Sequence, residues 1–124
     1  MKNLVILLCA LLWSGIATAG DADKYTLSAD QLYAEYNANE VAADDKYKGK
    51  KVTVSGTVQQ IANDIFGHPY VSIGSDLVGV QCSFPDSRKS SVMRLTKGQQ
   101  VTIKGTVEGK MMDVQLSNSK LIEQ

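Results

Sequence analysis

Residues 48–58 read Lys-Gly-Lys-Lys-Val-Thr-Val-Ser-Gly-Thr-Val, and residues 97–107 repeat the phrase as Lys-Gly-Gln-Gln-Val-Thr-Ile-Lys-Gly-Thr-Val. Apolar and polar residues alternate in both copies, which is the pattern of a β-strand with one buried face. Each copy also has a glycine, Gly56 or Gly105, at a position where a regular strand would bury a side chain, and this predicts a bent strand. Two such strands are typical of a small closed β-barrel.

Short segments separated by turn residues make up the rest of the chain. Alternating hydrophobicity predicts five strands, at residues 51–61, 70–74, 77–84, 99–108 and 111–117. The pair Gly109-Lys110 predicts a tight hairpin turn between the last two strands. A short helix is expected at residues 88–95. The predicted order is therefore three strands, a short helix and two strands.

An amphipathic helix is expected ahead of the strands, at about residues 29–43. Ser28 can cap its first turn, and Gln31 stands three residues later, which completes a capping box. Leu32 and Tyr36 share one face of this helix, so the helix should pack on the barrel. A charged connector, residues 44–51, should then lead to the first strand.

The first 19 residues have the features of a secretory signal peptide. A short positive start at Lys2 precedes the apolar run Leu4–Trp13, and Ala17-Thr18-Ala19 fits the small-x-small rule of signal peptidase. The apolar run is too short to span a membrane, which takes about 20 residues. Cleavage is predicted after Ala19, leaving one domain at residues 20–124. The expected location is the periplasm or the medium, with no transmembrane segment after cleavage.

Charge and cysteine content restrict the functions open to this domain. The chain has 13 basic and 13 acidic residues, and removal of Lys2 with the signal peptide leaves 12 and 13. A near-neutral domain has no excess of positive charge to attract a polyanion, so the composition disfavours nucleic acid as a partner. The lysines at positions 46, 48, 50 and 51 stand beside Asp44 and Asp45, which favours a solvated loop over a phosphate patch. Cys82 alone remains after cleavage, so no internal disulfide is expected.

Five strands with a helix between the third and the fourth form the layout of the OB-fold, a partly open Greek-key barrel. More narrowly, residues 20–124 resemble the tRNA-anti-like family of exported bacterial OB-fold domains. The resemblance is carried by Asn39-Glu40, Ala43-Asp44, Tyr47-Lys48-Gly49-Lys50, Val54–Val58, Val80–Phe84, Leu95–Gly98 and residues 101–105. It implies a mainly β, OB-fold-like barrel and an exported protein, and it carries no agreed activity.

The loop after the first long strand contains most of the candidate ligand-binding residues, because OB-folds bind ligands with their loops and with the face of strands two and three. The candidates are Asn63, Asp64, Phe66, His68 and Tyr70, together with Lys110 from the predicted Gly109-Lys110 turn. Phe66 and Tyr70 could stack on nucleic-acid bases, but the outward face of the third strand has only Gly79, Gln81 and Ser83. We therefore expect the two aromatic residues to cap the open end of the barrel.

No catalytic, metal or cofactor site is predicted. His68 is the one histidine, and alternation turns Cys82 into the core, where a thiol is inert. Asp64 and His68 could share a metal ion, but two ligands of mixed type on a turn are a weak signal. The protein is therefore not expected to be an enzyme.

Two function classes remain from the sequence. The first is a non-catalytic binding module of the cell envelope, for an envelope protein, a peptide or a small polar ligand; the second is a single-stranded nucleic-acid-binding protein acting outside the cytoplasm. A stress-response or immunity role rests on analogy of fold alone. A polar strand face could bind an elongated ligand, although a solvated sheet face has the same composition. It comprises Thr53, Ser55, Thr57, Gln81, Ser83, Thr102, Lys104 and Thr106.

Overall fold

The computed structural model of the chain describes residues 25–75 and 79–123, so the predicted signal peptide lies outside the described residues. Strands dominate, and the helices are short. In chain order the elements are β1 (Thr26–Ser28), α2 (Ala29–Ala38), α3 (Glu40–Tyr47), β2 (Lys51–Asn63), β3 (Pro69–Ile73), β4 (Val80–Ser83), the 3-10 turn η1 (Asp86–Arg88), α4 (Lys89–Met93), β5 (Gln100–Met111) and β6 (Asp113–Glu123).

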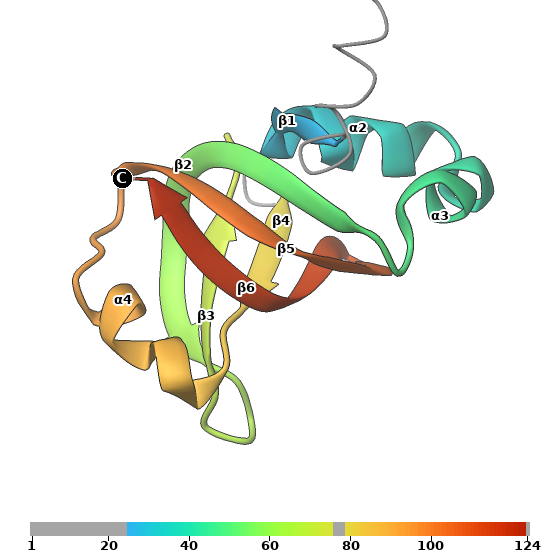
Figure 1. Cartoon of the computed structure of the whole chain (residues 1–124). Coiled ribbons are helices and arrows are strands. Elements are labelled where there is room, and N and C mark those ends of the chain that lie inside the picture. Colours follow the sequence, from blue (N-terminus) through green and yellow to red (C-terminus); the bar gives the residue numbers. More distant parts are fainter. Residues whose placement is uncertain (1–24, 76–78, 124) are drawn as a thin grey trace, which may run out of the picture.

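The two copies of the repeated phrase pair with each other, and this pairing closes the barrel. The sheet order is β1-β2-β3-β4-β6-β5, and β2 also pairs with β5. Val54 lies opposite Ile103 in this antiparallel ladder. From Val58 to Asn63, β2 pairs with β3 instead, and this ladder has an irregularity between Val58 and Gln60. The predicted five-stranded OB-fold-like Greek-key barrel is confirmed, and Figure 1 shows its strands curving around one another.

The inward rows of β2 and β5 build the core. Their buried members are Val52, Val54, Val58, Val101, Ile103 and Val107. Both repeat glycines stand in these rows, where other elements approach closely. A β-carbon on Gly56 would lie 3.3 Å from the Ala29 Cβ and from the Gly74 nitrogen, and one on Gly105 would lie 2.9 Å from the Ser119 Oγ. A side chain would therefore be tightly packed at Gly56, and at Gly105 it would force a neighbouring atom to move.

The predicted leader helix is two helices. Its start is confirmed: Ser28 Oγ accepts from the Gln31 N–H, and Gln31 Oε1 accepts from the Ser28 N–H. The single helix predicted at residues 29–43 is wrong, because Asn39 has extended backbone geometry and its Oδ1 accepts from the Ala42 N–H at 3.0 Å. An asparagine side chain that caps a new helix competes with continuation of the old one. The new helix, α3, replaces the first half of the predicted charged connector.

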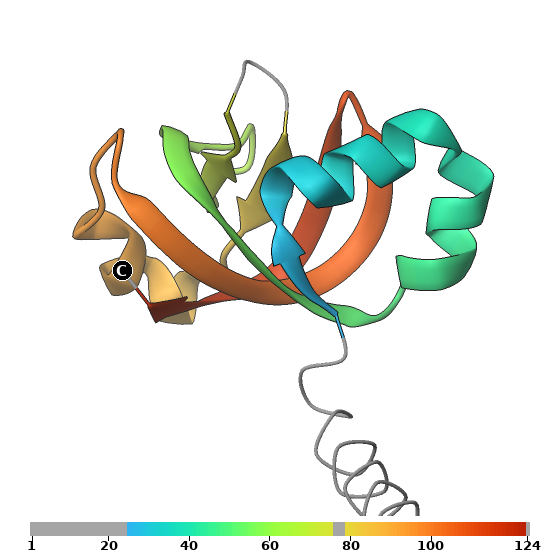
Figure 2. The ribbon, with the colours of Figure 1, turned by 90° about the horizontal axis from the view of Figure 1, so that it is seen from above.

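The leader helices cover one end of the barrel through buried aromatic and aliphatic side chains. Leu32, Tyr36 and Tyr47 are all at most 2% exposed. The Tyr36 and Tyr47 rings stack with centroids 6.5 Å apart, and the Tyr47 hydroxyl donates to Glu35 at 2.6 Å. Both views show α2 and α3 together on one side of the barrel and α4 on the other (Figures 1 and 2). The predicted packing of the leader on the barrel is confirmed.

The turn between the last two strands is not Gly109-Lys110, as the sequence predicted. β5 continues to Met111, with Gly109 opposite Gln115 and Met111 opposite Asp113. The ladder shifts register between Val107 and Gly109. Gly109 has a φ of 130°, which glycine adopts readily, so it allows the irregular strand geometry at this shift. The chain reverses at Met112, whose φ is 66°.

Other boundaries differ by a few residues from the expectations. The strand predicted at 77–84 is described from Val80 to Ser83, and residues 76–78 lie outside the described part. The helix predicted at 88–95 is η1 followed by α4. The sequence did not predict β1, which pairs in parallel with β2. Within residues 25–75 and 79–123, no helix is long and apolar enough to cross a membrane.

Candidate ligand-binding site

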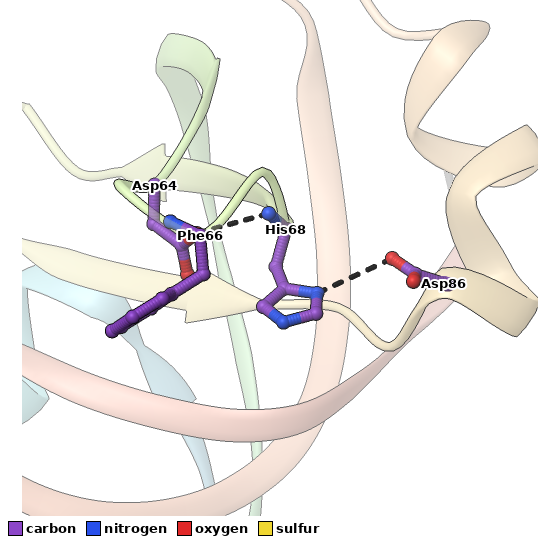
Figure 3. Close-up of polar contacts among 4 residues, drawn as sticks. All are labelled: Asp64, Phe66, His68 and Asp86. Carbon is purple, nitrogen blue, oxygen red and sulfur yellow. Dashed lines mark hydrogen bonds and ion pairs between the residues drawn. The ribbon is translucent and has the colours of Figure 1, made fainter.

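The loop between β2 and β3 is folded around one carboxylate (Figure 3). Asp64 Oδ1 accepts from the backbone N–H groups of Phe66 at 2.8 Å and His68 at 2.9 Å. The Asp64 N–H in turn donates to the His68 carbonyl at 2.8 Å. These N–H groups, that of His68 first, hold the pKa of Asp64 below its usual value because they stabilise the ionised form. Asp64 therefore shapes the loop.

The loop should loosen in acid. Some carboxyl groups have a lower pKa in the folded than in the unfolded state. Such a group stabilises the folded state at pH values above its unfolded pKa, and this stabilisation is lost as the pH falls through its folded pKa. The Phe66 and His68 amide signals should therefore shift, and their protection factors, taken against the intrinsic exchange rate at the same pH, should fall as Asp64 becomes protonated at its depressed pKa. Nuclear magnetic resonance across an acid titration measures both effects.

The matched control is Asp64→Asn, which keeps an oxygen acceptor and cannot titrate in this range. Its Phe66 and His68 amides should show no acid transition. An identical transition in both proteins would contradict the role given to Asp64.

An open cavity of about 420 Å³ lies between this loop and the segment after β4. His68 connects its two sides, since its Nδ1 lies 3.3 Å from Asp86 Oδ1. The lining residues are Asp64, His68, Ser83, Phe84, Pro85, Asp86 and Asn118. Carboxylate, imidazole, hydroxyl and amide groups thus surround a small apolar floor, an arrangement suited to orienting a polar ligand.

The structure brings some of the predicted site residues together and separates others. Asp64 and His68 line the cavity, whereas Lys110 lies within β5, opposite Val114 in β6, with its Nζ 5.9 Å from the ring centre of Tyr33 in α2. Asn63 is the last residue of β2 and pairs with Pro69. The predicted set is therefore not one site.

Phe66 and Tyr70 do not cap the barrel as expected. Phe66 is 78% exposed at the tip of the loop, because the turn that Asp64 closes carries it away from the core, and its neighbour Ile65 is 93% exposed. In Figure 3 the Phe66 ring points away from Asp86. Tyr70 is half-buried in β3, beside the cavity and opposite Ser83.

Sequence reasoning missed Asp86 and Asn118 in the cavity. The position of Asp86, just after the third predicted strand, could have indicated its place in the cavity. In an antiparallel pair the end of one strand lies beside the start of the other, so the end of β4 lies beside the β2–β3 loop. Asn118 gave no local signal. It has a left-handed φ of 50° in β6 and reaches the cavity only through the pairing of β6 with its neighbours.

The outward face of β3 and β4 is polar and has one aromatic side chain. Tyr70 lies opposite Ser83, and Ser72 lies opposite Gln81. All four are half-buried. The prediction that Gln81 and Ser83 face outward while Cys82 faces inward is confirmed. Burial raises the pKa of the Cys82 thiol, so it stays protonated and unreactive.

The His68 and Asp86 side chains are 51% and 72% exposed, so water screens their interaction. Both side chains are therefore accessible to a ligand that enters the cavity. Among the described residues, no group of three or more His, Cys, Asp or Glu side chains is placed to hold a metal ion.

Comparisons with known proteins give a family and a fold. The family model tRNA_anti-like matches residues 13–121. A solved structure of a "putative nucleic acid-binding lipoprotein" from Klebsiella pneumoniae subsp. pneumoniae is 24% identical, with a TM-score of 0.69, and the match covers 86% of this chain and 97% of that one. No curated protein matches this chain.

More distant structures have the same barrel. An OBody bound to hen egg-white lysozyme is 22% identical with a TM-score of 0.52, and the match covers 63% of this chain and 81% of that one. A second OBody bound to the same protein is 19% identical with a TM-score of 0.51, over 64% and 87% of the two chains. Likeness at this level of identity concerns the fold.

Proposed function

Because the chain belongs to the tRNA_anti-like family, we propose that it is a non-catalytic binding protein of the bacterial envelope whose ligand is a peptide segment of another protein. The ligand occupies the cavity between the β2–β3 loop and η1 and extends over the outward face of β3 and β4. The observation that carries this proposal is the chemistry of that cavity.

The carboxylates lining the cavity are accompanied by one imidazole. Asp64 and Asp86 face it together with His68, and the described residues that line it include no lysine or arginine. A cavity with this balance attracts ammonium, guanidinium and amide groups and repels phosphates. A peptide segment with a basic side chain fits this charge better than a nucleic-acid backbone does.

The loop tip adds an apolar contact surface. Ile65 and Phe66 are 93% and 78% exposed, and Asp64 fixes the backbone that carries them. Exposed aromatic and aliphatic side chains on an ordered loop are typical of protein-binding surfaces. Because the loop is held by its own hydrogen bonds, little entropy is lost when a ligand binds.

Nucleic-acid binding remains the alternative function, favoured by the name of the Klebsiella relative. Single-strand-binding OB-folds combine stacking aromatics with a basic groove on the same face. Here Tyr70 is the one aromatic side chain on the outward face of β3 and β4. One stacking platform beside two carboxylates supports a peptide ligand over a single strand.

A photocrosslinking amino acid at position 66, in protein produced in its native host, tests the proposal. We expect one discrete protein adduct, which weakens strongly when Asp86→Ala is added. The control position is Lys97, which is also exposed and lies outside the cavity. A synthetic peptide from the crosslinked segment should then bind the purified protein, and Asp86→Ala should reduce its affinity by about tenfold, the loss of one charged hydrogen bond.

Equal adducts from positions 66 and 97, or no peptide binding, would contradict the proposal. A fluorescent single-stranded oligonucleotide provides the competing test: binding that falls steeply with salt and disappears in Tyr70→Ala would establish the alternative function. Export is tested in the same cells, where the periplasmic protein should have the intact mass of a chain that begins at Gly20.

A further inference from the structure

A second charged surface lies on the outer face of β2, β5 and β6. We propose that it is a binding site for a phosphate-class oxyanion. A groove of about 300 Å³ there, the basic groove, is lined by four cationic residues, Lys51, Arg88, Lys104 and Lys120, with Thr106 and Asn118 between them. No carboxylate is among the described residues that line it. The inference does not depend on the proposed function, because the basic groove and the peptide cavity share only Asn118.

Strand register places the three lysines of the basic groove side by side. Lys104 in β5 lies directly opposite Lys120 in β6. Lys51 in β2 lies opposite Thr106, two residues from Lys104, so it is a diagonal neighbour of Lys104. Side chains directly opposite have Cβ atoms about 5 Å apart, and diagonal neighbours about 7–8 Å.

Like charges at such separations destabilise a sheet unless an anion balances them. Within the described residues, Lys46 pairs with Glu35 and the His68 imidazole contacts Asp86, and no carboxylate pairs with a groove lysine there. An oxyanion seated between Lys104 and Lys120 would remove their repulsion. It would also accept the N–H donors of both side chains.

Arg88 is held in position at the edge of the basic groove. Its Nη1 donates to the Asn118 carbonyl at 3.1 Å, to Asn118 Oδ1 at 3.2 Å and to the Ser119 carbonyl at 3.1 Å. These bonds use one of the three guanidinium nitrogens, and Nε and Nη2 carry further N–H donors. A guanidinium fixed in this way is pre-organised for an oxyanion, because its orientation is already determined before binding.

Net charge does not account for the basic groove. The whole chain is formally neutral. Its acidic residues gather elsewhere: α2 and α3 contain Asp30, Glu35, Glu40, Asp44 and Asp45 against the single basic Lys46. The fold therefore separates an acidic helical end from a basic strand face, and the positive potential is local to the groove.

The lining of the groove also indicates the kind of phosphate ligand. Among the described residues that line it, none is aromatic, and the one large apolar residue is Ile122, which is 49% exposed. Bases of a single strand would find nothing to stack on. The volume suits a phosphate group with a small substituent, which can come from a soluble phosphate compound or from a lipid headgroup.

Titration with inorganic phosphate and pyrophosphate, followed by amide chemical shifts at low ionic strength, tests the site. We expect shifts concentrated at Lys104, Thr106 and Lys120, and affinity that falls as salt is added. The double variant Lys104→Gln/Lys120→Gln should lose about tenfold or more in affinity, because two charge-assisted hydrogen bonds are removed.

The matched control is Lys48→Gln/Lys97→Gln, which removes the same charge from two exposed lysines outside the groove. It should bind phosphate like the wild type. Equal losses in both double variants, or no shifts at the groove in the wild type, would overturn the inference.

Two further arms identify the source of the phosphate. If the protein sediments with phosphatidylcholine vesicles that contain phosphatidylglycerol, and not with pure phosphatidylcholine vesicles, the ligand is a lipid headgroup. If the protein binds pyrophosphate and does not sediment with either kind of vesicle, the ligand is a soluble compound. A single-stranded oligonucleotide that binds far more tightly than pyrophosphate, and loses this in Lys104→Gln/Lys120→Gln, would overturn the assignment to a small phosphate ligand.

Discussion

Valine in place of Gly105 should destabilise the domain by about 3 kcal/mol, the upper part of the usual range for overpacking a core. The reason is the 2.9 Å between the position of a new β-carbon and Ser119 Oγ, with Leu116 atoms at 3.2 Å. Ser119 Oγ can rotate aside, but Leu116 Cβ is fixed to the backbone of β6, which is paired with β5 and cannot move away without losing ladder hydrogen bonds. Thermal unfolding followed by circular dichroism should show a melting temperature lower by roughly 10 °C or more.

The adjacent position provides the control. Thr106→Val adds no volume to the core, because Thr106 is on the outer face of β5, and it should change stability by less than about 0.5 kcal/mol. A second variant separates close packing from other causes: Gly105→Ala should be less damaging in a Ser119→Ala background, where the crowding Oγ is absent. Equal melting temperatures for wild type and Gly105→Val would contradict the close-approach explanation.

Truncation of Leu32 to alanine should have a comparable effect, a loss of about 2–5 kcal/mol. Leu32 is fully buried, and α2 packs against β2, β4 and β6. Removing its side chain leaves a cavity between the leader and the barrel, because neighbouring elements fixed by strand pairing cannot collapse into it. Urea unfolding of the wild type and the variant measures the difference.

Val41→Ala is the matched control, since Val41 is 81% exposed on α3. It should stay within about 0.5 kcal/mol of the wild type, because little buried area is lost and alanine favours a helix. If Leu32→Ala were no more damaging than Val41→Ala, the leader would be an appendage and the packing described above would be wrong.

The peptide cavity could be predicted only in part. Asp64 and His68 were identified from the sequence because they share one short loop between two recognisable strands. Asp86 and Asn118 line the same cavity from segments that follow β4 and interrupt β6, so no local pattern connected them to the loop. The sequence predicts Lys110 in a turn, like the residues of the β2–β3 loop. In the structure Lys110 lies in a strand, with its Nζ near the Tyr33 ring.

The basic groove was beyond sequence reasoning for the same reason. Lys51 was assigned to a solvated cluster with its neighbours in the chain, and Lys104 to a polar strand face. Their approach to Lys120 and Arg88 depends on the register of β2, β5 and β6. A shift of one residue would turn each of these lysines toward the core.

The sequence by itself determined the barrel, because the alternation of apolar and polar residues and the two repeat glycines are local properties that constrain each strand wherever it lies. It also determined that Cys82 is buried and that the helical leader begins at Ala29, with Ser28 as its N-cap. The tertiary structure alone decided which polar residues meet. Side chains far apart in the chain become neighbours through ladder register and strand curvature, and these are set by the packing of the whole barrel.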